Sequence, residues 1–119
     1  MNRLTIVAAC GAVLMAACEP SPNELLTRGI SEFQLGRVEK AREFFERVLD
    51  QKPSHPDALF YMGRVCYVEG NYELADYYYH CCLDVDPSYE QARDELEMVA
   101  EKLKTEGREP SSGFRIRRP

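Results

Sequence analysis

Two consecutive blocks of 34 residues decide the fold, PNELLTRGISEFQLGRVEKAREFFERVLDQKPSH (residues 22–55) and PDALFYMGRVCYVEGNYELADYYYHCCLDVDPSY (residues 56–89). When one block is laid on the other, identical residues coincide along the whole length: Pro22 with Pro56, Leu25 with Leu59, Gly29 with Gly63, Gly36 with Gly70, Glu39 with Glu73, Ala41 with Ala75, Leu49 with Leu83 and Pro53 with Pro87. Aromatic residues coincide as well, Phe33 with Tyr67, Phe44 with Tyr78 and Phe45 with Tyr79. A fixed period with this many coincidences indicates a structural repeat.

Each block contains two amphipathic segments, which predict four helices, over residues 23–35, 39–51, 57–69 and 73–85. Gly36 and Gly70 follow the first helix of each block, where glycine adopts the left-handed conformation of a helix end without steric cost. Pro53 and Pro87 end the second helices. The pattern therefore predicts two helical hairpins in succession.

Gly29 and Gly63 fall inside the first helices, where a glycine costs about 1 kcal/mol relative to alanine. We expect this cost to be offset by close approach, because a helix without a Cβ at that point can lie directly against Ala41 or Ala75 of its partner helix.

The period and these residues resemble the tetratricopeptide repeat. The resemblance lies in a small residue in the first helix, an Ala and an aromatic residue in the second, and a final Pro: Gly29 and Gly63, Ala41 and Ala75, Phe45 and Tyr79, Pro53 and Pro87. Leu25 and Leu59 stand where the family usually has Trp, and Arg28 and Glu32 stand at usually apolar positions, so we expect the first helix to be weakly packed. The resemblance implies an all-α fold, a fragment of an α-solenoid.

The segment after the repeats reads as a capping helix over residues 90–104. Its apolar residues form one stripe, made of Ala92, Leu96, Val99, Ala100 and Leu103. One apolar and one polar face is what the end of a repeat array requires. The predicted repeat domain therefore covers residues 23–104. Residues 105–119 hold little to bury and predict a disordered, locally basic tail.

The N-terminus reads as a targeting segment. Leu4–Ala17 is an apolar run of fourteen residues. This is the length of the hydrophobic region of a signal peptide, and it is short for a membrane span, which needs about 20 residues. The run ends Leu14-Met15-Ala16-Ala17-Cys18, which resembles the lipobox of bacterial lipoproteins. This resemblance implies a signal peptide over residues 1–17, a lipidated Cys18 and a tether over residues 18–22. In enteric bacteria, Asp directly after the lipidated Cys retains a lipoprotein in the inner membrane. Residue 19 is Glu and not Asp, which favours the outer membrane, facing the periplasm. The alternative is an ordinary secretory signal.

Composition argues against several classes of function. The formal net charge is −5, and an acidic chain is a poor nucleic-acid binder. Tyr77, Tyr78 and Tyr79 diverge around a helix, so we expect no stacking platform. The family resemblance implies that Tyr79 lies in the core, and we expect Tyr77 at the surface. The sequence has no glycine-rich phosphate loop and none of the common hydrolase motifs. We therefore expect no enzyme activity and no cofactor.

The cysteines of the repeats offer a second class of function. Cys66 and Cys82 fall on core positions and Cys81 on a flank. Consecutive residues diverge on a helix, so His80, Cys81 and Cys82 cannot meet at one metal ion. Because the total of five cysteines is odd, we hypothesise that Cys81 forms a disulfide with another chain. A thiol-based redox or metal accessory protein using Cys81 and Cys82 is the alternative function, and a soluble cytoplasmic helper is another.

The family resemblance implies a binding surface on the concave face, lined by the first helix of each repeat. The corresponding positions are Asn23, Leu26, Ile30, Phe33 and Gln34 in the first repeat, and Asp57, Phe60, Arg64, Tyr67 and Val68 in the second. Leu26 and Ile30 replace the Lys and Asn with which one subfamily binds a terminal carboxylate, so an extended apolar peptide or a partner helix fits better. Equally, Leu26, Ile30 and Phe60 would pack under the tether or the cap.

These expectations combine into one prediction, a membrane-anchored periplasmic scaffold that binds envelope proteins through the concave face. Two repeats are few for this architecture, which usually needs about three. We therefore expect self-association into a homo-oligomer, or docking onto a larger complex.

Overall fold

The computed structural model describes residues 19–108, and this part of the chain is entirely helical between its turns. Five helices follow one another: α2 (Pro22–Gln34), α3 (Val38–Gln51), α4 (Pro56–Val68), α5 (Tyr72–Val85) and α6 (Glu90–Thr105). Each begins within one residue of its predicted start. The predicted signal peptide and Cys18 lie outside the described residues, as does the tail from residue 109.

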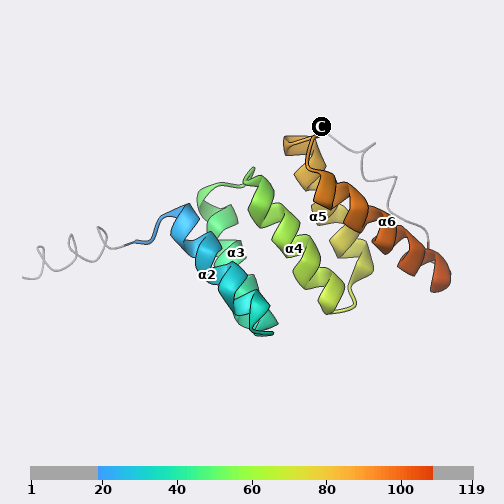
Figure 1. Ribbon diagram of the computed structural model, residues 1–119, viewed down its shortest axis with the longest axis horizontal. Coiled ribbons are helices and arrows are strands. Elements are labelled where there is room, and N and C mark those ends of the chain that lie inside the picture. The colour runs from blue at the N-terminus through green and yellow to red at the C-terminus, as the bar shows by residue number, and fades with distance from the viewer. Residues whose placement is uncertain (1–18, 109–119) are drawn as a thin grey trace, which may run out of the picture.

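The helices pack as two hairpins and a cap, which confirms the predicted solenoid fragment. α2 packs on α3, α4 packs on α5, and α6 packs on α5 (Figure 1). α3 also contacts α4, so the two hairpins share a continuous interior. In Figure 1, α2, α4 and α6 lie toward the viewer, with α3 and α5 behind them.

Glycines end the helices as the sequence predicts. Gly36 and Gly70 have φ of 78° and 81°. At each, the glycine N–H and the following N–H donate to carbonyls of the last helical turn, such as Gly36 N to Phe33 O (3.0 Å) and Arg37 N to Glu32 O (2.9 Å). This is the Schellman arrangement. Gly107 forms a third such end, after α6.

The helix starts follow the same 34-residue register. Ser21 forms a capping box with Glu24, and His55 Nδ1 accepts a hydrogen bond from Ala58 N (3.4 Å). Tyr89, the next residue in that register, is the N-cap of α6. α6 therefore occupies the position of the first helix of a third repeat.

α6 closes the array as a cap should. Ala92, Val99 and Leu103 are buried, and Leu96 and Ala100 are half-buried, which confirms the predicted apolar stripe. The prediction that the tail starts at residue 105 was wrong for its first four residues. Helix α6 runs to Thr105, Gly107 closes it, and the Arg108 side chain binds Glu73 of α5.

The interior is built around two aromatic rings in equivalent positions, Phe45 and Tyr79, both fully buried. A Cβ on Gly29 would lie 2.6 Å from Phe45 Cε1, and one on Gly63 would lie 2.5 Å from Tyr79 Cε1. The glycines do permit close approach, but the atoms nearest to them belong to aromatic rings and not to Ala41 or Ala75. The expectation about the partner residue was wrong because the ring of the second helix reaches across the hairpin.

The first helix is weakly packed, as the sequence predicts. Leu25 and Gly29 are the buried residues of α2. The equivalent helix α4, which has neighbours on both sides, buries seven residues. Arg28 is exposed, and the half-buried Glu32 forms an ion pair with Arg37 (3.3 Å).

Candidate protein-binding face

The predicted binding residues lie on α2 and α4, and Arg64 of α4 links these two helices to α6. Its guanidinium lies 5.2 Å from the ring centroid of Phe33 on α2, and 5.9 Å from those of Phe60 and Tyr61 on α4. Its Nε lies 3.3 Å from Glu95 Oε1 on α6. A cation held over aromatic rings and paired with a carboxylate fixes this side chain in place. We call the surface that carries Phe33, Arg64 and Glu95 the α2–α4–α6 face.

Glu95 connects the surface to the core. Its Oε2 accepts a hydrogen bond from the Tyr79 hydroxyl at 2.5 Å. Burial, followed by the hydrogen bond to Glu95, raises the pKa of Tyr79 far above its ordinary value. The phenol therefore stays protonated and remains a donor at any physiological pH. Arg64 is thus positioned by a residue that the hydrophobic core itself holds.

Phe60 was predicted as a binding residue, and the structure contradicts this. Its side chain is only 5% exposed. The ring packs against Tyr61, Tyr79 and Tyr89 with centroid separations of 5.4, 5.8 and 5.1 Å. Tyr89 belongs to the start of α6, so the cap covers Phe60, one of the two placements that the sequence left open.

Asp57 is engaged by the same cap. The Tyr89 hydroxyl donates to Asp57 Oδ1 at 2.7 Å. Burial and this hydrogen bond raise the pKa of Tyr89, so it too remains a donor. Asp57 therefore helps to hold the start of α6, through its Oδ1 atom.

The other predicted residues remain at least partly accessible. Asn23, Gln34 and Val68 are exposed, with Val68 57% accessible. Leu26, Ile30, Phe33 and Tyr67 are half-buried; the first three pack partly against the core around Phe45. Leu26 and Ile30 therefore pack against α3 and α4 and not under the tether or the cap, and binding of a ligand by their exposed parts stays a prediction.

Helix α6 also contributes side chains to this face, beyond the residues predicted from the sequence. Met98 is 52% exposed. With Tyr67 of α4 and with Glu101, Lys102 and Thr105, it lines a hollow of about 320 Å³. The sequence contains a sign of this contribution, because Met98 follows Arg64 by 34 residues and Arg64 follows Ile30 by 34 residues. The 34-residue register of α2 and α4 therefore extends to α6.

The thiols lie as predicted, and two of them are unsuited to redox chemistry. Cys66 and Cys82 are buried and Cys81 is half-buried. Burial raises the pKa of Cys66, and burial with nearby acidic groups raises the pKa of Cys82 to about 12. Only a thiolate is a good nucleophile or metal ligand, so these two thiols are inert at neutral pH. The prediction of an exposed Tyr77 and a buried Tyr79 is confirmed.

Metal-binding clusters and membrane-spanning helices are two further features to consider in residues 19–108. Within this range, no three His, Cys, Asp or Glu side chains are arranged to hold a metal ion. Likewise, no helix between residues 19 and 108 has the length and apolar content to cross a membrane.

Comparison with known proteins agrees with the repeat assignment. Residues 22–65 match the family model described as tetratricopeptide repeat, which supports a tetratricopeptide repeat protein. The chain is also similar to a protein named protein adenylyltransferase Fic from Drosophila willistoni. The two are 31% identical over 74 residues, which is 61% of this chain. The chain spans only 15% of the length of that relative. Repeats of this kind suggest a protein–protein interaction scaffold.

Proposed function

We propose that this protein is a lipid-anchored adaptor that binds an apolar peptide or a partner helix on the α2–α4–α6 face and thereby assembles proteins of the bacterial envelope. The observation that carries the proposal is the exposure of Val68 on α4, four residues after Arg64, and of Met98 on α6, three residues after Glu95, the ion-pair partner of Arg64. Large exposed apolar side chains gathered on one face of a soluble protein favour an interaction site.

The chemistry of the face indicates the class of ligand. The accessible apolar side chains of the α2–α4–α6 face are Leu26, Ile30, Phe33, Tyr67, Val68 and Met98, and its accessible polar side chains include Asn23, Gln34, Glu101 and Lys102. The ion pair of Arg64 Nε with Glu95 reduces the attraction of Arg64 for a ligand carboxylate. Methionine adapts to many apolar shapes. An apolar helix face or extended segment fits this surface better than a charged terminus.

Adenylyl transfer, the activity in the name of the Drosophila relative, is not part of the proposal. The similarity to that relative covers 15% of its length. The present sequence contains no glycine-rich phosphate-binding loop. The shared stretch is better explained by a common repeat architecture, and fold alone does not determine function.

Peptide binding is testable with a displayed library of random dodecapeptides selected on the immobilised full chain. We expect selected peptides to be rich in apolar residues. Val68→Glu should weaken their binding at least about tenfold in fluorescence anisotropy, because a charge would replace an apolar contact worth about 1.5 kcal/mol or more.

The matched control is Arg47→Glu, which places the same residue at an exposed position of α3, outside the α2–α4–α6 face. It should leave the affinity within about twofold, far below the tenfold effect that 1.4 kcal/mol gives. Equal losses in Val68→Glu and Arg47→Glu would show that the α2–α4–α6 face does not bind the peptides.

The anchor is testable by intact mass of the protein from a bacterial host. We expect the wild type to begin at Cys18 and to carry added acyl mass, because the lipobox Cys receives the lipid. The Cys18→Ala variant should lack both changes. One acyl chain anchors only marginally, so several chains on Cys18 are expected for stable attachment.

A wild-type protein that retains Met1 and carries no lipid would overturn the proposed location. The tetratricopeptide binding module would then stand without its membrane. Placement in the envelope rests on the N-terminal sequence, outside the described residues, and so it depends wholly on this measurement.

A further inference from the structure

Helix α5 presents an apolar stripe on the side that its sequence register marks as external. Leu74, Tyr77, Cys81 and Val85 follow one another at intervals of three or four residues, which places them along one side of the helix. The residues 34 positions earlier, on the same side of α3, are Lys40, Glu43, Arg47 and Gln51. All four of these are exposed. On the first repeat this side is polar throughout, and Gln51 also donates a hydrogen bond from Nε2 to Pro20 O (3.2 Å).

The stripe is accessible in the described chain. Tyr77 is 37% and Val85 43% exposed, and Leu74 and Cys81 are half-buried. At the N-terminal end of the stripe, a hollow of about 300 Å³ is lined by Asn71, Glu73, Leu74 and Tyr77. The α5 stripe is apolar where the equivalent side of α3 is polar, which indicates that another segment or molecule covers the stripe.

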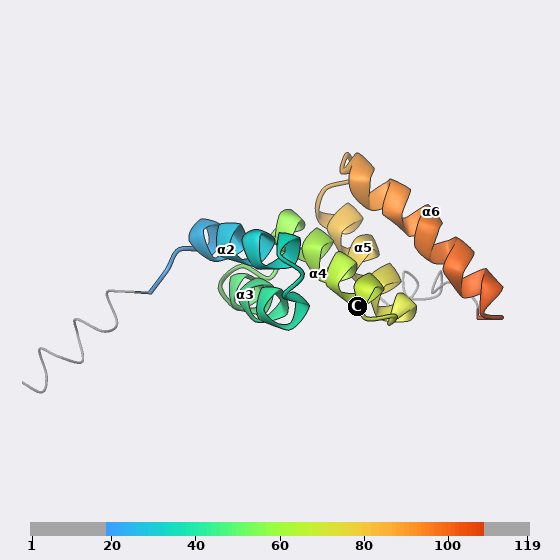
Figure 2. The same ribbon diagram turned by 60° about the horizontal axis from the view of Figure 1, so that its bottom comes forward.

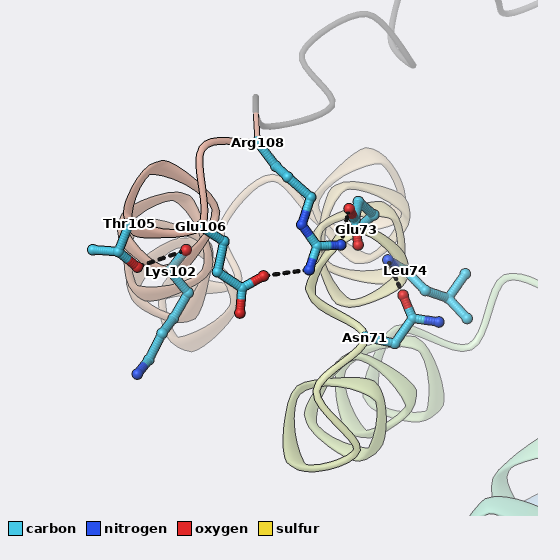
Figure 3. Close-up of polar contacts among 7 residues, drawn as sticks. All are labelled: Asn71, Glu73, Leu74, Lys102, Thr105, Glu106 and Arg108. Carbon is cyan, nitrogen blue, oxygen red and sulfur yellow. Dashed lines mark hydrogen bonds and ion pairs between the residues drawn. The ribbon is translucent and has the colours of Figure 1, made fainter.

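The chain itself leads to this place. Arg108 closes α6 by donating its backbone N–H to Leu103 O (2.8 Å). Its guanidinium then binds Glu106 and Glu73, which lines the hollow beside Leu74 (Figure 3). Figure 2 shows the end of α6 beside the start of α5. The segment that follows Arg108 therefore starts next to the stripe.

The composition of that segment complements the stripe and its surroundings. Residues 114–118 read Phe-Arg-Ile-Arg-Arg, so in an extended backbone Phe114 and Ile116 point to one side and Arg115 and Arg117 to the other. Residues 19–108 carry 11 Lys and Arg against 19 Asp and Glu, whereas residues 109–119 carry three Arg against one Glu. Opposite net charges favour association of the two parts.

The distances permit this contact. Five residues lie between Arg108 and Phe114, and the six Cα-to-Cα steps that join them reach about 20 Å in an extended chain. The stripe from Leu74 to Val85 is about 16 Å long at the rise of an α-helix. A second copy of the protein fits less well as the occupant, because it would bring together two bodies with a large excess of negative charge.

We propose that residues 114–118 of the same chain lie along the α5 stripe, with Phe114 and Ile116 on Leu74 and Tyr77 and with the arginines directed to the acidic side chains beside the stripe. The contact covers the apolar surface of α5. Together with the Arg108–Glu73 ion pair, it holds the cap helix α6 against α5.

The test places the photoreactive residue p-benzoylphenylalanine at position 114 of the full chain. After irradiation we expect a monomeric product whose cross-linked peptide maps to α5 between Leu74 and Val85. The Tyr77→Glu/Val85→Gln variant gives α5 the residues found at Glu43 and Gln51. It should lower the yield about tenfold, the factor that 1.4 kcal/mol of lost apolar contact produces.

Both substituted side chains are substantially exposed, so the variant should keep the helical circular dichroism spectrum of the wild type. Glu43→Gln/Gln51→Glu, changed on the equivalent side of α3, serves as the control and should leave the yield unchanged. Cross-links that join two chains would overturn the proposal in favour of a second copy. Cross-links scattered over the surface, or a yield unaffected by Tyr77→Glu/Val85→Gln, would overturn it as well.

Discussion

Replacing Tyr79 with alanine is expected to lower the free energy of unfolding by about 3–5 kcal/mol, the range for removing a large buried aromatic side chain. Tyr79 is fully buried between α4, α5 and α6, and its ring fills the space beside Gly63. Stability of about 0.05–0.15 kcal/mol per residue gives a domain of this size little to spare. Urea unfolding followed by circular dichroism should therefore show a greatly lowered midpoint.

Tyr79→Phe separates packing from the hydrogen bond to Glu95. The phenylalanine ring keeps the packing, and Glu95 keeps Arg64 as a partner at 3.3 Å. We expect a loss of about 1.5–3 kcal/mol, typical of one hydrogen bond to a charged group. If Tyr79→Ala costs no more than Tyr79→Phe, the ring does not carry the stability assigned to it.

Gly63→Ala is expected to destabilise the protein, although alanine favours a helix over glycine by about 1 kcal/mol. The added Cβ would lie 2.5 Å from Tyr79 Cε1 and 2.6 Å from Cδ1. Forcing an extra carbon into a close-packed interior costs about 1–3 kcal/mol, and more where the neighbour cannot move. The ring is held at both ends, by the core and by Glu95, so we expect overpacking to exceed the gain in propensity.

A double-mutant cycle can identify the ring as the cause. In a Tyr79→Leu background the obstructing ring is absent, and Gly63→Ala should then become neutral or stabilising by up to about 1 kcal/mol. Chemical denaturation of the four proteins gives the coupling energy. A destabilisation by Gly63→Ala that persists unchanged in the Tyr79→Leu background would exclude the ring contact as its origin.

Much of the fold was predictable because it depends on local patterns. The 34-residue period placed each helix start to within one residue, and the glycines at 36 and 70 end helices as expected. Helix periodicity, caps and left-handed glycine ends involve residues close together in the chain. For the same reason, the core positions of Cys66 and Cys82 followed from the helix register, whereas that of Tyr79 came from its match to the aromatic of the repeat family.

The binding face was predicted less well, because it depends on contacts between helices. Phe60 occupies a position that would face a ligand, yet Tyr89 covers it from α6. Met98 was overlooked, although it adjoins Tyr67 across the hollow between α4 and α6. Neither result follows from one repeat considered by itself, since α6 changes the surroundings of α4.

By itself, the sequence determined the repeat, the helix boundaries, the turn glycines and the apolar side of each helix, because helix formation responds to side chains within about one turn. The tertiary structure decided which ring fills the space beside each helical glycine, how Arg64 is held over Phe33 and beside Glu95, and which predicted surface residues stay accessible. The physical reason is that close packing brings together side chains far apart in sequence, and their shapes determine the outcome only after the helices have docked.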